Sequence, residues 1–163
     1  MAEYFTQFSA TLNLGNEQAA ATAQALYDDM MERGVDRNSA DDTTPEFDLV
    51  MQVEDDGTPL AWFTQGDGQG NIDHVTFFVQ ELSRLISMTG RWGFTWSHSC
   101  SKPRVHAFGG GAVIVDMETG EAWHQDSRAW LVQSQKGPMP AGDPAPVPRT
   151  LSGVQSTRTN LKH

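Results

Sequence analysis

The sequence has one cysteine, Cys100, and no long apolar run among its 163 residues. A single cysteine excludes an intramolecular disulfide and is typical of reducing compartments. No stretch approaches the ~20 apolar residues of a membrane-spanning helix. The N-terminus lacks the basic start and apolar run of a secretory signal. We therefore expect a cytoplasmic protein that does not bind or cross a membrane.

Basic residues are also scarce, since 11 Lys and Arg stand against 21 Asp and Glu for a net charge of −10. Residues 28–73 hold thirteen acids and two arginines, a net charge of −11, whereas 134–163 carry +3. A negative field repels phosphate, which argues against direct nucleic-acid binding. The same field attracts cations, so we predict a protein partner with a basic surface, contacted through Asp41, Asp42, Asp55 and Asp56.

The hydrophobic pattern alternates between strand and helix periodicity. It predicts strands over 4–14, 47–53, 60–64 and 92–97, with helices over 17–33 and from about 72 to 89. This order is that of the split βαβ, ferredoxin-like arrangement. A C-terminal hairpin over 112–125 and a short helix to about residue 133 follow. We therefore predict a two-layer α+β fold with both main helices on one sheet face.

Short polar motifs mark the ends of these elements. Asn16 is positioned to cap the first helix, and Asn71 or Asp73 to cap the second. The dipeptide Asp56-Gly57 is a strong hairpin-turn signal.

The composition changes near the C-terminus. The segment 137–149 contains five of the eight prolines and few apolar residues. Such a segment buries too little apolar surface to offset its conformational entropy. We predict one folded domain over 1–133 and a disordered, proline-rich tail over 134–163.

The stretch from Trp92 to Asp116 concentrates chemically able side chains. A nucleophilic cysteine needs a nearby base, and histidines flank Cys100, but their spacing does not show that the groups converge. One cysteine and five scattered histidines form no metal-binding motif. We therefore predict no catalytic residues, no metal and no cofactor, and keep as an alternative a pocket lined by Trp96, His98, Cys100, Lys102, Arg104 and His106.

Two further features of this stretch have ordinary structural explanations. Lys102 and Arg104 are suited to pairing with an internal carboxylate, or to holding an anionic ligand. The triple glycine 109–111 precedes a predicted strand rather than a helix, unlike the glycine-rich turns that cradle phosphates. These glycines are expected to permit a bend or close packing beneath the tryptophans.

The residues Ser101 to Arg104 and Phe108 to Ala112 carry a resemblance. The segment resembles the (Cys/Trp)-Ser-Lys-Pro-Arg-x-x-x-Phe-Gly-Gly-Gly-Ala stretch of small uncharacterised bacterial proteins associated with phages and plasmids. That family has no established activity, so the resemblance implies a mobile genetic element setting and assigns no residue a role.

The leading interpretation is a non-catalytic, acidic protein–protein interaction module. In its sharpest form this is a phage- or plasmid-encoded inhibitor that engages a basic, nucleic-acid-handling partner. The alternatives are a small enzyme or ligand-binding protein using the pocket around Cys100, His98, His106 and Arg104, and a structural component tethered by its tail. The sequence leaves the oligomeric state open.

Overall fold

The structure is a computed structural model that describes residues 2–34, 44–66, 70–102, 104 and 107–136. Its element order is β1 (Tyr4–Asn13), α1 (Glu17–Gly34), β2 (Asp48–Val53), β3 (Pro59–Thr64), α2 (Ile72–Ile86), β4 (Arg91–Cys100), β5 (Gly109–Asp116), β6 (Ala122–Asp126) and α3 (Ser127–Lys136). The predicted elements are therefore present, and all three glycines of the triple 109–111 lie within β5 rather than before it.

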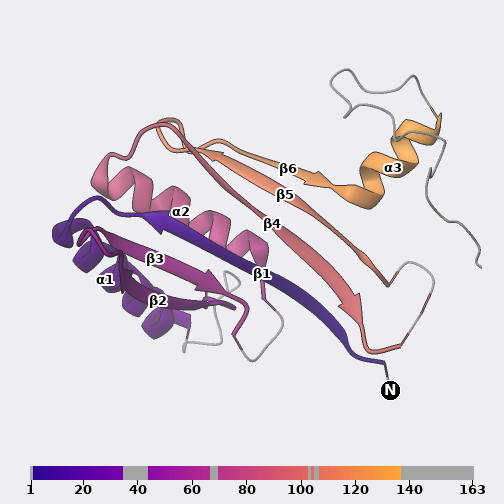
Figure 1. Cartoon of the computed structure of the whole chain (residues 1–163), viewed down its shortest axis with the longest axis horizontal. Coiled ribbons are helices and arrows are strands. Elements are labelled where there is room, and N and C mark those ends of the chain that lie inside the picture. Colours follow the sequence, from indigo (N-terminus) through magenta and orange to yellow (C-terminus); the bar gives the residue numbers. More distant parts are fainter. Residues whose placement is uncertain (1, 35–43, 67–69, 103, 105–106, 137–163) are drawn as a thin grey trace, which may run out of the picture.

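The strands form one antiparallel sheet in the order β2-β3-β1-β4-β5-β6 (Figure 1). The α+β prediction is confirmed. The sheet has six strands and the fold three helices, whereas a ferredoxin-like unit has four strands and two helices. The difference arises because the C-terminal hairpin, β5 and β6, extends the same sheet beyond β4.

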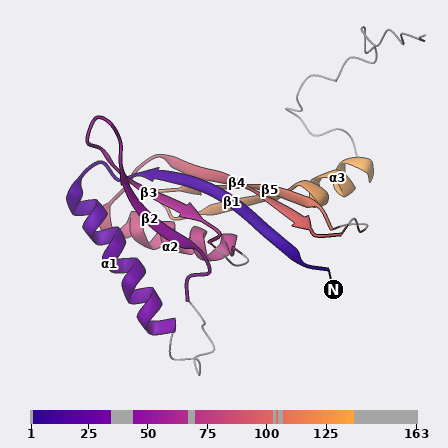
Figure 2. The ribbon, with the colours of Figure 1, turned by 60° about the horizontal axis from the view of Figure 1, so that its bottom comes forward.

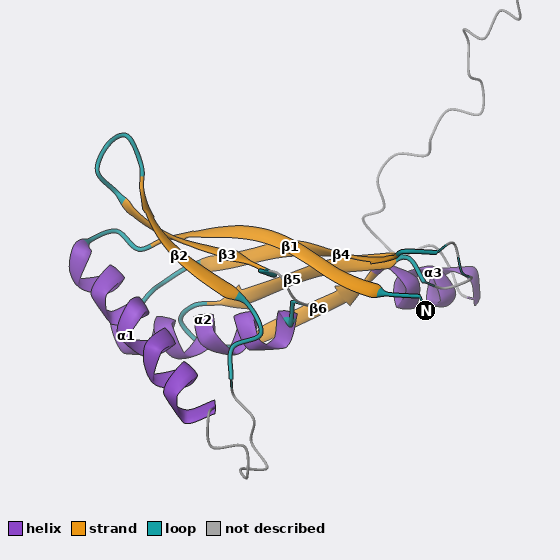
Figure 3. Cartoon of the chain, turned by 90° about the horizontal axis from the view of Figure 1, so that it is seen from below, coloured by secondary structure: helices purple, strands orange, loops and turns teal. Residues whose placement is uncertain are grey.

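The helices α1 and α2 lie together on one face of the sheet, as Figures 2 and 3 show. The pattern of burial agrees, because inward residues such as Phe8, Phe63 and Val113 are buried while their strand neighbours are half-buried or exposed. The opposite face of the sheet carries no helix in the described part of the chain (Figure 3).

Side chains fix the ends of the elements as the sequence indicated. Asn16 caps α1 by accepting the backbone N–H of Ala19 at 2.9 Å. Asn71 caps α2 by accepting the backbone N–H groups of Asp73 at 3.0 Å and His74 at 3.3 Å. Gly57 has a positive φ of 89° in the β2–β3 turn, a conformation that favours glycine.

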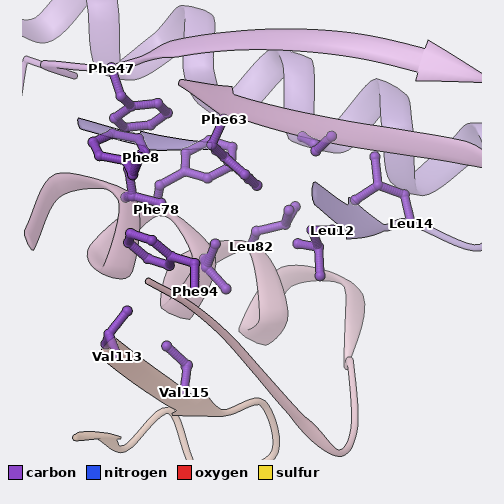
Figure 4. Packing of buried hydrophobic residues seen from close by; sticks show 14 of the residues in the cluster. Phe8, Leu12, Leu14, Phe47, Phe63, Phe78, Leu82, Phe94, Val113 and Val115 are labelled. Atoms are coloured by element: carbon purple, nitrogen blue, oxygen red, sulfur yellow. The ribbon is translucent and has the colours of Figure 1, made fainter. Parts of the chain in front are cut away.

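An aromatic cluster forms the centre of the core (Figure 4). Phe63 and Phe78 are fully buried, and their ring centroids lie 5.8 Å apart in an edge-to-face arrangement. Phe47 lies 5.9 Å from Phe63 and 5.7 Å from Phe78. Such pairs add to the stabilisation from burial alone. This cluster packs α2 against β3, and Tyr27 of α1 joins it with its ring centroid 5.5 Å from that of Phe47.

The far end of the molecule, around α3, is thinly packed. The helix α3 has no buried residue, and its Leu131 and Val132 are exposed. It continues past the domain boundary predicted at residue 133, to Lys136. The remainder of the predicted tail, 137–163, lies outside the described residues.

None of the helices in the described ranges combines the length and apolar character needed to span a bilayer.

Candidate functional site

The four acids predicted to contact a partner do not form one described site. Asp41 and Asp42 lie outside the described residues. Asp55 and Asp56 lie in the β2–β3 turn, where Asp56 accepts the backbone N–H of Thr58 at 2.8 Å. Hydrogen bonds from Thr58 lower the pKa of Asp56. This turn follows the last residue of β2, so it lies about 20 Å from the acids at the other end of that strand.

A second group of acids gathers at that other end, and we call it the acidic corner. Three elements converge there, namely the end of α1, the start of β2 and the start of α2. Tyr27 of α1 donates its hydroxyl to the Phe47 carbonyl at 2.9 Å. Asn71 donates its backbone N–H to the Glu46 carbonyl and its side-chain amide to a Glu46 carboxylate oxygen, both at 2.9 Å. The acidic corner consists of Asp28, Glu32, Glu46 and Asp48, whereas the Asp73 carboxylate lies 3.9 Å from the Nδ1 atom of His124 on β6.

The acidic corner has a negative local field, which acts on the pKa of the Tyr27 hydroxyl. Burial raises the pKa of the Tyr27 hydroxyl above its ordinary value, and the carboxylates of Asp48 and Asp28 raise it further. Both carboxylates therefore lie close enough to Tyr27 to act on the same hydroxyl. Glu32 follows Asp28 by one helical turn, which places it on the same side of α1.

Few described cations neutralise the acidic corner. Arg33 pairs with Asp29 one turn earlier on α1. The Nδ1 atom of His74 lies 3.9 Å from a Glu46 carboxylate oxygen and accepts the Glu46 backbone N–H at 3.3 Å. The four carboxylates are therefore the dominant charges of this surface.

The Trp96 side chain is tightly packed between β4, β5 and β6. Only 7% of it is exposed, and its ring centroid lies 6.2 Å from that of His124. A Cβ atom at Gly111 would lie 2.6 Å from the Trp96 ring, so glycine makes room for the indole. This confirms the expectation that the triple glycine permits close packing beneath a tryptophan. The Trp96 Nε1 atom is buried and has no hydrogen-bond partner in the described structure.

His98 and Cys100 lie on β4 without forming a nucleophile and its base. The two residues share a strand face, two positions apart. The Nδ1 atom of His98 is hydrogen-bonded to the Thr6 hydroxyl at 3.1 Å. Cys100 is a half-buried free thiol, with no ring nitrogen bonded to it in the described part of the chain. Among the described residues, the contact between a thiol and a base that thiolate chemistry requires is not found.

A small cavity of about 230 Å³ opens beside His98, at the end of the sheet that α1 and α2 leave uncovered. Thr6 and His98 contribute to its wall, and Asp126 and Arg128 come from the junction of β6 and α3. Asp126 also caps α3 by accepting the Ala129 backbone N–H at 2.7 Å. Of the five residues of the predicted pocket that the structure describes, only His98 lines this cavity.

Lys102 and Arg104 lie exposed in the connection between β4 and β5. Neither pairs with a carboxylate among the described residues, so the internal ion pair expected from the sequence is not found there. His106 lies outside the described residues. The predicted pocket is therefore not assembled by the part of the chain that the structure describes.

No three potential metal ligands among His, Cys, Asp and Glu come together in the described ranges. The carboxylates of the acidic corner thus form a surface rather than a described chelating group.

No family model, no curated protein and no solved structure matches this chain.

Proposed function

We propose that this protein is a non-catalytic interaction module that binds a basic partner protein through the acidic corner. The observation that carries the proposal is the grouping of Asp28, Glu32, Glu46 and Asp48 where α1 meets the start of β2 beside Asn71. Such a surface is complementary to lysine and arginine side chains and accelerates their encounter with it.

The rigid attachment of the acidic corner favours binding over mere solubility. Tyr27 contacts the ring of Phe47 with a centroid separation of 5.5 Å, and it donates to the Phe47 carbonyl. The spacing of the carboxylates is therefore set by buried groups. Fixed charges lose less conformational entropy on binding than charges on a flexible segment do.

A basic partner in a phage or plasmid setting would be a nucleic-acid-handling protein. Carboxylates held at fixed spacing can occupy a cationic surface that otherwise receives phosphates. The protein then acts as an inhibitor by competition. The resemblance noted for the segment 101–112 supports this setting.

We also infer that the first six elements form a ferredoxin-like unit, to which β5, β6 and α3 are additions. Within the sheet, the first four strands follow one another as β2-β3-β1-β4, and α1 and α2 share one face. This arrangement supports the inference, since a split βαβ unit places its two crossover helices on one side of an antiparallel sheet.

The test compares two triple variants of equal charge in affinity capture from the native host. The first neutralises the acidic corner with Asp28→Asn, Glu32→Gln and Asp48→Asn. The matched control neutralises exposed acids elsewhere with Glu54→Gln, Asp55→Asn and Glu118→Gln. We expect the wild-type chain and the control to retain one basic protein, and the corner variant to lose it.

Equal loss from both variants would show that net charge alone drives the association. Retention by both would show that the partner binds elsewhere. Either result contradicts binding at the acidic corner, provided that both variants unfold at the wild-type temperature.

A second candidate function is the binding of a small polar ligand in the cavity beside His98. The cationic Arg128 and the imidazole of His98 at the cavity wall favour it. Its volume of about 230 Å³ is below the ~300–1,000 Å³ of most ligand pockets. A small molecule that co-purifies with the wild-type chain, and not with Arg128→Ala, would support this function in native mass spectrometry.

A further inference from the structure

The face of the sheet opposite α1 and α2, which we call the open face, carries almost no charge. Strand register assigns its residues, because partners in neighbouring strands point to the same side. Only three of its outward residues are charged, and all lie near its margins. Arg91 and Asp116 pair with each other at 3.9 Å at one end of β4 and β5. Asp48 is the first residue of the edge strand β2.

The centre of the open face is neutral and polar. Gln7 pairs with Ser97 in the register of β1 and β4, and Ser9 of β1 lies one step further along the same face. The indole N–H of Trp62 donates to the Ser9 hydroxyl at 2.9 Å, which ties the Trp62 side chain to this face. The nearby Gly93 and Gly110 have no side chains that could rise from the sheet.

Large apolar side chains surround this centre. Val50 on β2 is 41% exposed, Ile114 on β5 is 48% exposed, and Trp123 on β6 is 50% exposed. Soluble surfaces usually contain roughly 25–35% charged residues. A chain with a net charge of −10 that leaves the centre of a whole sheet face without charge has the kind of surface that interfaces use.

The charge distribution indicates which partner would bind the open face. Residues 1–133 carry a net charge of −13, so two copies of the chain repel each other at most orientations. At the open face, two copies meet without bringing carboxylates together, because the charges of that face lie at its margins. A basic partner gains no attraction at a neutral surface, whereas a second copy avoids repulsion there.

The size of the open face suits a dimer. Six strands spaced ~4.8 Å apart, with a mean length of about 25 Å, give a footprint of roughly 600 Å² before side-chain relief is included. A standard interface takes ~800 Å² of accessible surface from each partner.

We propose that the chain forms a two-fold symmetric dimer in which the open faces of two copies pack against each other. The sheets then lie ~10 Å apart, as in other face-to-face sheet packings. A two-fold axis along the strands sets Trp123 and Ile114 of one copy opposite Val50 and Trp62 of the other. The central hydroxyl and amide groups both donate and accept hydrogen bonds, so identical residues can pair across the axis, directly or through water.

Sedimentation equilibrium of the full chain, from about 1 to 200 µM, tests this proposal. The wild-type chain is expected to dimerise within that range. Ser97→Glu places a negative charge at the centre of the open face and is expected to raise the dimer dissociation constant by on the order of tenfold or more. The matched control, Ala21→Glu, adds the same charge at an exposed position on α1 and should leave the dissociation constant unchanged.

Trp123→Ser provides a second, uncharged perturbation of the open face and should also weaken the dimer. Raising the salt concentration from about 50 to 300 mM should leave the dimer intact or tighten it, because salt screens the repulsion between two acidic chains. A monomer throughout the concentration range overturns the proposal and assigns the face to a different occupant. So does a dimer that neither Ser97→Glu nor Trp123→Ser weakens, or one that dissociates at high salt.

Discussion

The two halves of the sheet differ in how they are packed. In the half beneath α1 and α2, Phe63, Phe78 and Leu82 are fully buried. In the half beyond α2, around α3, the exposed side chains include Phe108, Trp130 and Leu131. Stability should therefore come mainly from the first half, while the second half holds most of the chemically able side chains.

The difference also separates the two kinds of candidate site. The acidic corner is attached directly to the aromatic core through Tyr27 and Phe47. The cavity beside His98 is bounded by a connection and by a helix without buried residues. Surfaces attached to a rigid core keep their geometry, which is why the acidic corner carries the proposed function.

The largest expected effect is the loss of an aromatic side chain from the packed half. Phe78→Ala should lower the free energy of unfolding by about 3–5 kcal/mol, because it removes a fully buried ring and leaves a cavity. Leu131→Ala in the exposed helix α3 should cost less than about 1 kcal/mol. Urea unfolding monitored by circular dichroism measures both. Similar losses would show that the two halves are packed equally well.

A smaller effect is expected at the glycines of β5. Gly111→Ala should cost about 1–3 kcal/mol, since the added Cβ atom meets the Gln125 carbonyl and the Trp96 ring. Gly109→Ala is the matched control, because its nearest neighbour is the Ser127 hydroxyl at 3.9 Å. Thermal unfolding compares the two. If Gly109→Ala lowers the melting temperature as much as Gly111→Ala does, the close packing of Trp96 against Gly111 is not the cause.

A further, smaller effect is expected in the pH dependence of stability, at Asp116 beside the β5–β6 turn. Backbone N–H groups of Thr119 and Glu118 donate to Asp116 at 3.1 Å. With help from Arg91, they lower the pKa of this carboxyl below 3.8. Its contribution to stability is therefore present above that pH and is lost as the pH falls through the lower folded-state pKa. Asp116→Asn should flatten the decline of the melting temperature below pH 3.8. Glu118→Gln, an exposed neighbour, serves as the control, and an equal flattening there would contradict the assignment.

The smallest effect should follow removal of the C-terminal segment. Truncation after Gln135 is expected to change the melting temperature by less than about 3 °C, because α3 buries no residue that the cut removes. Differential scanning calorimetry measures the change. A drop well beyond that value would place part of the stabilising core in the C-terminal segment.

The sequence predicted the fold better than it predicted the sites. Helix caps such as Asn16 and Asn71 are local, because each side chain bonds backbone groups two or three residues away. The extension of the sheet by β5 and β6 is harder to predict from the sequence, because strand pairing joins residues far apart in the chain.

The acidic corner illustrates the same limit. Counting charges identified the acidic segment 28–73, but the grouping of Asp28 with Asp48 depends on the contact between Tyr27 and Phe47. A tyrosine at the end of an amphipathic helix, near two acids, was the available signal. Asp55 and Asp56 belong to the same acidic segment, but they lie in a turn at the other end of β2.

The salt dependence of partner association tests the central claim most directly. The rate constant for binding of the captured partner should fall markedly between about 50 and 300 mM salt, while the dissociation rate changes less. Neutralising Asp28, Glu32 and Asp48 should slow association at low salt and remove most of that dependence. An association rate constant that changes neither with salt nor with these substitutions would contradict binding through the acidic corner.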